Sequence, residues 1–278
     1  MKLSVCTIAL RTRLSEEAFR LLARLGYKNL DVLAYGKQAH FSRDMDKDQR
    51  RKILNLAKSL GLRIVSFAGS VGDKFNSDVE AERCQEVQKV QDEINLAVEA
   101  GAAVIRFSPG AGEDFDKIMS RSVPHLKEVS AYAAKKKVRL GMENHSGGMS
   151  GNPDHVAALC REIGSPWFGV IYEPGNLFGM NRDYKQGLET QREYIVHVHL
   201  KDGYPHTFDD DMYTRQRLYC TAFGRGKLDI PWIMERLQAI GYDRFVSIEY
   251  EGWHPEYHLP PDEEGLAQAK AYLARWLA

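Results

Sequence analysis

The stretch KKKVRLGMENH (135–145) joins the basic end of a predicted helix to a short apolar run, which closes on Glu143, Asn144 and His145. Strands that are covered on both faces are near-continuous apolar runs, as strands of a parallel sheet flanked by helices are. Polar residues at the end of such a strand have a place where that end borders a binding site. The fold therefore depends on whether this pattern recurs along the chain.

The pattern recurs eight times, with helical patterns between the apolar runs. Helices that end in glycine precede several runs, as in LGYKNL (25–30), where the glycine can take up the left-handed turn. Eight βα units in about 250 residues predict a closed (β/α)8 TIM barrel. The first turn, IALRTRLS (8–15), lacks the glycines of a doubly wound nucleotide-binding sheet. The expected strands are 3–9, 28–33, 63–69, 103–109, 138–144, 168–174, 195–202 and 245–252.

Composition narrows the classes of protein. The 38 basic and 38 acidic residues balance, so no net field attracts nucleic acid or an anionic membrane. The N-terminal run LSVCTIAL is short and leads into Arg11, and no run reaches the roughly 18 apolar residues of a membrane span. No linker divides the 278 residues, and the four cysteines show no ligand spacing. We expect one cytoplasmic domain, residues 1–278, that binds neither nucleic acid nor membrane.

Acidic and imidazole side chains lie near the ends of the last four predicted strands: Glu143, Glu173, His199 and Glu249. In a (β/α)8 barrel the carboxyl ends of the strands form the active-site rim, so these residues should converge. Three carboxylates packed together repel one another unless a cation neutralises them. Oxygen ligands with one imidazole suit one divalent ion, with Mn²⁺ our first expectation and Mg²⁺, Co²⁺ or Zn²⁺ the alternatives.

These residues belong to motifs through which nearly the whole chain resembles the xylose-isomerase-like barrels. That family includes sugar and keto-sugar isomerases and epimerases, inosose dehydratase and the endonuclease IV branch. The resemblance implies that Glu143, Glu173, His199 and Glu249 hold the metal, and that Glu143 and Glu249 are the acid and base. Two departures are Glu173, where the family usually has Asp, and Arg225, where an acidic pattern is usual. The motifs are ENH (143–145), EPGN (173–176), HVHLKD (197–202), FGRGKLD (223–229) and SIEYEG (247–252).

Further rim residues are candidates for catalysis. His145 lies two residues past Glu143 and is either an alternative base or a group that orients that carboxylate. Lys201 shares the parity of His199, so it either donates to a substrate oxygen or pairs with a rim carboxylate. His197 should lie one layer below His199 as a core residue.

Four residues are candidates for substrate binding. Arg106 is a charge inside a predicted strand and, if it faces the barrel interior, needs an acidic partner. Arg225 lies in the segment 203–229, which we expect to be a loop; the alternatives are an ordinary solvated loop and contact with a polar or anionic group. Asn176 closes EPGN, and Trp253 opens an aromatic stretch that either stacks on sugar or packs on the next helix.

The leading functional hypothesis is a divalent-metal-dependent isomerase or epimerase of a small keto-sugar or polyol, which abstracts a proton and passes through a metal-stabilised enediolate. The alternative is a lyase on the same scaffold, which eliminates water from an inosose or cleaves a 3-oxo-glycoside. An endonuclease IV-like repair enzyme is disfavoured by the neutral charge, and a barrel used only for binding remains if the metal site is incomplete. The ligand is then a small sugar or cyclitol, and the resemblance implies a homo-oligomer.

Overall fold

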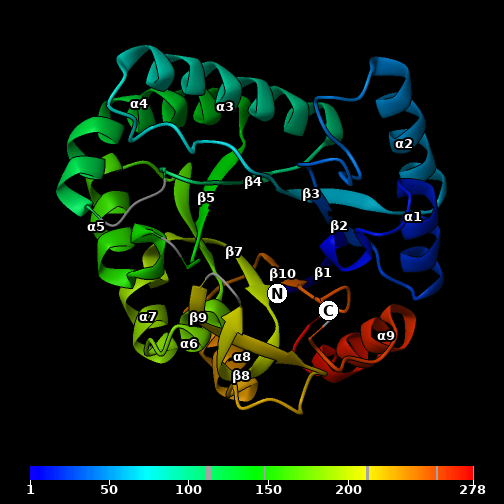
Figure 1. Ribbon diagram of the computed structural model, residues 1–278. Helices are drawn as coiled ribbons and strands as arrows, with labels where there is room; N and C mark the ends of the chain where they lie inside the picture. Colours follow the sequence, from blue (N-terminus) through cyan, green and yellow to red (C-terminus); the bar gives the residue numbers. More distant parts are fainter. Residues whose placement is uncertain (111–113, 147, 211–212, 255, 278) are drawn as a thin grey trace.

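A closed parallel barrel forms the centre of the molecule (Figure 1). The computed structural model describes residues 1–110, 114–146, 148–210, 213–254 and 256–277. Around the barrel the strands follow the order β1-β10-β7-β6-β5-β4-β3-β2, which confirms the (β/α)8 prediction and all eight strand positions. The barrel strands are β1 (Lys2–Cys6), β2 (Asn29–Leu33), β3 (Arg63–Ala68), β4 (Val104–Phe107), β5 (Arg139–Glu143), β6 (Phe168–Tyr172), β7 (Ile195–Leu200) and β10 (Phe245–Ile248).

Helices surround the barrel and cover its outer face (Figure 1). Their inward faces are apolar: in α1, for example, Ala18, Phe19, Leu21 and Leu22 are buried. None of the helices in the described ranges has both the length and the apolar composition that crossing a bilayer requires. The helices are α1 (Ser15–Arg24), α2 (Lys47–Ser59), α3 (Glu80–Ala100), α4 (Phe115–Lys136), α5 (Pro153–Ile163), α6 (Pro174–Gly179), α7 (Tyr184–Gln191), α8 (Ile230–Ala239) and α9 (Asp262–Leu273), with short 3-10 turns at η1 (Thr7–Leu10), η2 (Met149–Gly151) and η3 (Arg192–Tyr194).

A buried polar layer lies inside the barrel on β1, β7 and β10. The hydroxyl oxygens of Ser4 and Ser247 are 2.6 Å apart, and Ser247 Oγ is 2.7 Å from Nε2 of His197. All three side chains are fully buried. His197 therefore lies in the barrel interior, two residues before His199, as the strand alternation predicted.

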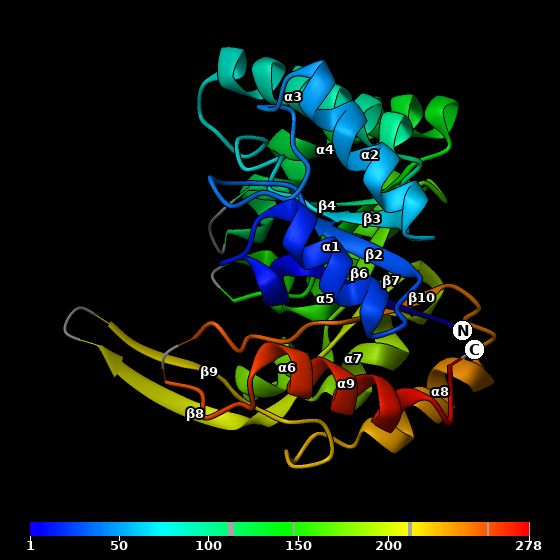
Figure 2. The same ribbon diagram turned by 90° about the vertical axis from the view of Figure 1, so that its right-hand side faces the viewer.

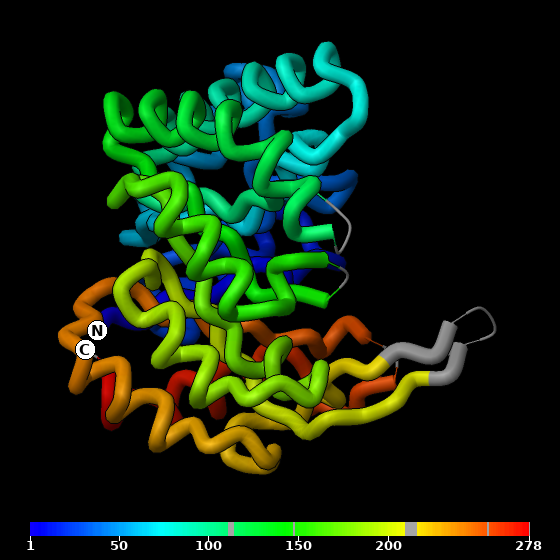
Figure 3. The backbone as a smooth tube through the Cα atoms, turned by 90° about the vertical axis from the view of Figure 1, so that its left-hand side faces the viewer, coloured from blue at the N-terminus to red at the C-terminus, as the bar shows by residue number. Residues whose placement is uncertain are grey.

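The segment after β7 differs from the prediction. Instead of a loop over 203–229, β8 (Asp202–Asp210) and β9 (Tyr213–Thr221) form an antiparallel hairpin. The alternating Tyr204, His206 and Phe208 are a period-two signal that sequence reasoning missed. Figures 2 and 3 show the hairpin projecting from one end of the molecule, while the two termini lie side by side at the other end. The hairpin adds a wall on the side of the barrel where the candidate residues lie.

Candidate active site

The four predicted ligands converge at the carboxyl ends of their strands. Glu143 ends β5, Glu173 directly follows β6, His199 lies on β7, and Glu249 directly follows β10. All four are buried, and each can offer one ligand atom such that these atoms lie within 4.8 Å of one another. The fold thus brings together side chains that are up to 106 positions apart, from 143 to 249, in the sequence.

Glu173 has an unpaired oxygen at this cluster. Its Oε1 accepts a hydrogen bond from the backbone N–H of Gly175 at 2.8 Å, whereas its buried Oε2 has no hydrogen-bond partner. Burial raises the pKa of Glu173 well above its usual value; Lys201 opposes this shift and Glu249 adds to it. A buried polar atom without a partner is costly, and a divalent cation would satisfy it. The donor set of three carboxylates and one imidazole therefore fits a divalent metal ion.

His199 is held between two carboxylates. Its Nδ1 is 2.6 Å from Oε1 of Glu143, and its Nε2 is 2.6 Å from Oδ2 of Asp31. Burial would lower the pKa of His199, but Glu143 and Asp31 outweigh it and raise that pKa well above its usual value. Since Asp31 occupies Nε2, Nδ1 is the nitrogen that faces the cluster. Protonated His199 thus occupies, between its two acids, the electrostatic position that a cation would share.

Sequence reasoning missed Asp31. The residue lies on β2, where the whole strand NLDVL is buried, and its Oδ1 has no hydrogen-bond partner. A carboxylate inside an apolar strand is the same kind of signal that drew attention to Arg106. Asp31, His197 and His199 also form a group that could hold a metal, but Nε2 of His197 already contacts Ser247 at 2.7 Å. We therefore treat Asp31 as the partner of His199.

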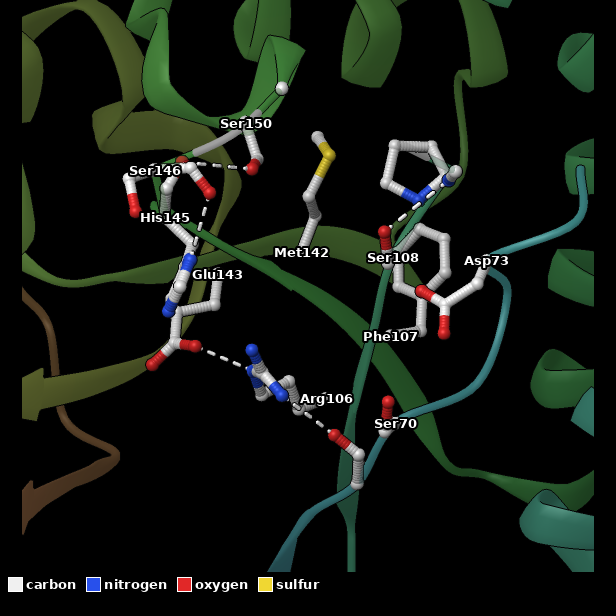
Figure 4. Close-up of a pocket in the computed structure, with 14 residues that line it drawn as sticks. Ser70, Asp73, Arg106, Phe107, Ser108, Met142, Glu143, His145, Ser146 and Ser150 are labelled. Carbon is white, nitrogen blue, oxygen red and sulfur yellow. Dashed lines mark hydrogen bonds and ion pairs between the residues drawn. The ribbon is translucent and has the colours of Figure 1, made fainter. Parts of the chain in front are cut away.

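Arg106 has the acidic partner that its position required. Its Nε donates to Oε2 of Glu143 at 2.5 Å, and its Nη1 donates to the carbonyl of Gly69 at 2.8 Å (Figure 4). Burial would raise the pKa of Glu143, but Arg106 and His199 outweigh it and hold that pKa well below its usual range. Glu143 is therefore ionised at neutral pH.

Lys201 pairs with rim carboxylates, one of the two alternatives left by the sequence. Its Nζ lies 2.7 Å from Oε2 of Glu249 and 2.8 Å from Oε1 of Glu251. Burial would lower the pKa of Lys201, but Glu249 and Glu251 raise it well above its usual value. Glu251 was not predicted, although it shares the parity of Glu249 in SIEYEG. The buried ammonium is thus fixed beside the cluster.

A cavity of about 880 Å³ lies above these residues. His145 lines it and is exposed; its Nδ1 is 3.0 Å from the carbonyl oxygen of Ser146. Asn176 also lines it and donates from Nδ2 to the carbonyl of Asn144 at 2.9 Å. Trp253 contributes a wall, with the guanidinium of Arg11 lying 4.5 Å from its ring centroid. Three of the four predicted substrate-binding residues, Arg106, Asn176 and Trp253, thus border this cavity.

The aromatic stretch after β10 packs on the hairpin. The rings of His254 and Tyr257 stack at 4.2 Å, and the hydroxyl of Tyr257 donates to the carbonyl of Leu218 on β9 at 3.0 Å. The ring of Phe208 on β8 lies 6.1 Å from that of Tyr257. The hairpin and this segment therefore support each other and together wall the cavity.

Arg225 is exposed and lines neither this cavity nor a smaller one beside it. Its turn is held by the carboxylate of Asp202, which accepts hydrogen bonds from the N–H groups of Gly203 and Gly224 at 2.8 Å and of Gly226 at 3.1 Å. A Cβ at Gly226 would lie 2.0 Å from Oδ1 of Asp202, so this close approach requires glycine. The motif FGRGKLD thus fixes backbone geometry beneath the hairpin.

Comparison with known proteins agrees with this architecture. The family model described as xylose isomerase-like TIM barrel matches residues 19–276. A curated relative from Haemophilus influenzae, named "Putative L-ribulose-5-phosphate 3-epimerase", is 23% identical over 269 residues, which cover 94% of this chain and 90% of that protein. An uncharacterized protein of Methanocaldococcus jannaschii is 24% identical over 173 residues, which cover 59% of this chain, and the match spans 56% of that protein's length.

Solved structures share the fold at low sequence identity. The probable 3-DHS dehydratase AsbF of Bacillus anthracis superimposes with a TM-score of 0.76 at 17% identity, covering 99% of each chain. A xylose isomerase-like TIM barrel protein from Mycobacterium smegmatis, in complex with magnesium, superimposes with a TM-score of 0.75 at 15% identity, covering 99% of this chain and 95% of that one. At such identities the likeness establishes the barrel and leaves the reaction to be argued from the site.

Proposed function

The chain belongs to the xylose isomerase-like TIM barrel family, and on that premise we propose that it is a divalent-metal-dependent isomerase or epimerase of a small keto-sugar or polyol. The observation that carries the proposal is the unpaired Oε2 of Glu173 in a buried cluster with Glu143, His199 and Glu249, beneath a cavity large enough for a sugar. An enzyme of sugar chemistry is the activity that the named relatives share.

Glu143, Glu173, His199 and Glu249 would hold the metal ion, with Mn²⁺ our first choice and Mg²⁺, Co²⁺ or Zn²⁺ as alternatives. A bound divalent cation would polarise the substrate carbonyl and offset the negative charge that develops when the neighbouring carbon loses its proton. Asp31 would orient His199, because the acceptor at Nε2 leaves Nδ1 directed at the cluster. This chain's Glu173 replaces the shorter Asp that the family usually carries.

Proton transfer is assigned to Glu143 and Glu249, which come from β5 and β10 on opposite sides of the cluster. Arg106 and His199 keep Glu143 ionised and therefore able to accept a proton from the substrate carbon. Glu249 would return a proton on the other face, with the Lys201 ammonium 2.7 Å away to replenish it or to bind a substrate oxygen. Asn176 and Trp253 would position the sugar in the cavity.

A lyase on the same scaffold is the second candidate, and the position of His145 favours it. His145 is exposed and borders the cavity, where an imidazole can protonate a leaving hydroxyl or aglycone. The same initial proton abstraction by a rim carboxylate would then be followed by loss of the group at the next carbon.

Mass spectrometry in D₂O tests and separates the two reactions. Protein loaded with Mn²⁺ is incubated with keto-sugars, inososes and 3-oxo-glycosides, with chelated protein and Glu249→Gln as controls. Metal-dependent gain of deuterium with an unchanged carbon skeleton supports the isomerase or epimerase, and loss of water or aglycone supports the lyase. Absence of both across the panel, with metal bound, contradicts the proposal.

A further inference from the structure

A second, smaller cavity of about 220 Å³ adjoins the main one and has no part in the function proposed above. It lies between the loops that follow β3, β4 and β5, and it shares Arg106, Glu143 and His145 with the main cavity. We call it the side chamber. Because the two spaces share these residues as a common border, a single ligand can reach from the candidate metal cluster into the side chamber.

The side chamber is lined by hydroxyl groups. Ser70, Ser108, Ser146 and Ser150 border it (Figure 4). A serine hydroxyl both donates and accepts hydrogen bonds, as a sugar hydroxyl does. An apolar group placed here would leave these hydroxyls and the loop amides without partners, which is costly when water is excluded. The lining therefore favours a hydroxylated ligand.

The charges of the side chamber disfavour an anion. Arg106 is the one arginine or lysine that borders it among the described residues, and Glu143 neutralises that charge at 2.5 Å. Asp73 borders the opposite side (Figure 4) and forms no ion pair with a described residue. A carboxylate without a basic partner repels phosphate or carboxylate groups and accepts hydrogen bonds from uncharged hydroxyls. The ligand is thus a neutral polyol or glycosyl group.

The walls of the side chamber are fixed in place before any ligand binds. The N–H of Ser108 donates to the carbonyl of Val71 at 2.8 Å, which joins the loops after β3 and β4. Gly72 has φ +97°, and a Cβ there would lie 1.9 Å from the carbonyl oxygen of Ser108. The N–H of Gly72 donates to the buried Glu86 at 2.6 Å. A rigid polar cavity loses little entropy when a ligand orders in it.

We propose that the side chamber is a subsite for a neutral glycosyl group, so that the substrate is a glycoside whose keto ring reaches the metal cluster. This inference rests on the proposed function and specifies its substrate class. The main cavity of about 880 Å³ already suffices for one ring with its substituents, which leaves the side chamber for a second ring.

Substitutions far from the proposed ligands test the subsite. Ser108→Leu fills the side chamber and Asp73→Ala removes its free carboxylate, while Lys74→Ala alters the same loop at an exposed side chain outside the chamber. With a keto-monosaccharide and its glycoside as paired substrates, the first two variants should raise KM for the glycoside about tenfold. Turnover of the monosaccharide, and both activities of Lys74→Ala, should stay at the wild-type level. Equal effects on the two substrates would overturn the subsite.

A binding experiment keeps this inference separate from the reaction. Saturation-transfer NMR with maltose and chelator-treated protein reports contact with each ring without turnover. The subsite predicts transfer to at least one maltose ring in the wild type and its loss in Ser108→Leu, with the fold of the variant checked by circular dichroism. No transfer in the wild type, or equal transfer in both, overturns the subsite whatever the D₂O experiment shows. Transfer without deuterium exchange would retain the subsite and reject the proposed reaction.

Discussion

The two halves of the barrel contribute to the site in different ways. The second half delivers one ligand-type side chain from each of β5, β6, β7 and β10. The first half contributes Asp31 on β2 and Arg106 on β4, each of which pairs with a residue of the second half. The difference suggests a division of roles: one half holds the ion and moves protons, and the other fixes the orientation and charge of those groups.

Loss of Glu249 should have the largest effect, because it removes both a ligand and a proton carrier. We expect Glu249→Gln to lower kcat/KM by about 10³-fold or more. Its stability should change little, since Lys201 keeps Glu251 at 2.8 Å and the new amide oxygen can still accept a hydrogen bond. Steady-state kinetics and urea unfolding measure the two quantities. Near wild-type rates would remove Glu249 from the mechanism.

Glu143→Gln should lose activity as well but, unlike Glu249→Gln, should also lose stability. Arg106 would keep its buried charge without a carboxylate, which typically costs about 3–5 kcal/mol. The double variant Glu143→Gln, Arg106→Gln should regain much of this stability without regaining activity. If the single variant unfolds at the wild-type urea concentration, the link between the two halves is weaker than the structure indicates.

Glu93 on α3 shows what a buried acid does without a basic partner in contact. Burial raises its pKa to about 7, with Arg43 opposing, and no hydrogen bond engages its carboxylate among the described residues. A raised pKa means that its stabilising contribution is complete below about pH 4.5 and is lost as the pH rises to about 7. Glu93→Gln should therefore add on the order of 3 kcal/mol to the unfolding free energy at pH 8, and little at pH 4.5. An equal difference at both pH values would contradict this account.

Asp31 tests the contribution of the first half more directly. We expect Asp31→Asn to weaken Mn²⁺ binding about 10- to 100-fold, because the neutral amide holds and polarises His199 less strongly. Ser247→Ala, which alters the layer around His197, is the matched control and should bind Mn²⁺ like the wild type. Calorimetric titration measures both. Unchanged affinity in Asp31→Asn would mean that the second half orients its own ligands.

Glu173→Asp should have the smallest effect. Shortening this side chain restores the residue usual in the family, so we expect metal affinity and turnover to stay within about threefold of the wild type. Loss of metal would show that the cluster is built around the longer side chain, whose Oε1 accepts from Gly175 at 2.8 Å. Metal analysis after dialysis separates the two outcomes.

The contrast between the halves also explains how far the sequence could be read. The strands and the second-half cluster were predictable because apolar runs and short motifs such as EPGN are local signals. Asp31 escaped notice because its partner His199 is 168 positions away and only the closed barrel brings them together. The hairpin was missed because a polar, aromatic segment resembles a loop unless its alternation is counted. Contacts between distant strands are set by packing, which no local pattern records.

Calorimetric titration of Mn²⁺ into chelator-stripped protein tests the central claim most directly, namely that the second-half cluster binds a divalent ion. Glu173 and His199 both have raised pKa values without metal and must release protons to bind it. We therefore predict one ion per chain, proton release visible as a buffer-dependent heat, affinity that increases with pH, and loss of binding in His199→Gln. An absence of binding, or binding that survives His199→Gln unchanged, would contradict the account.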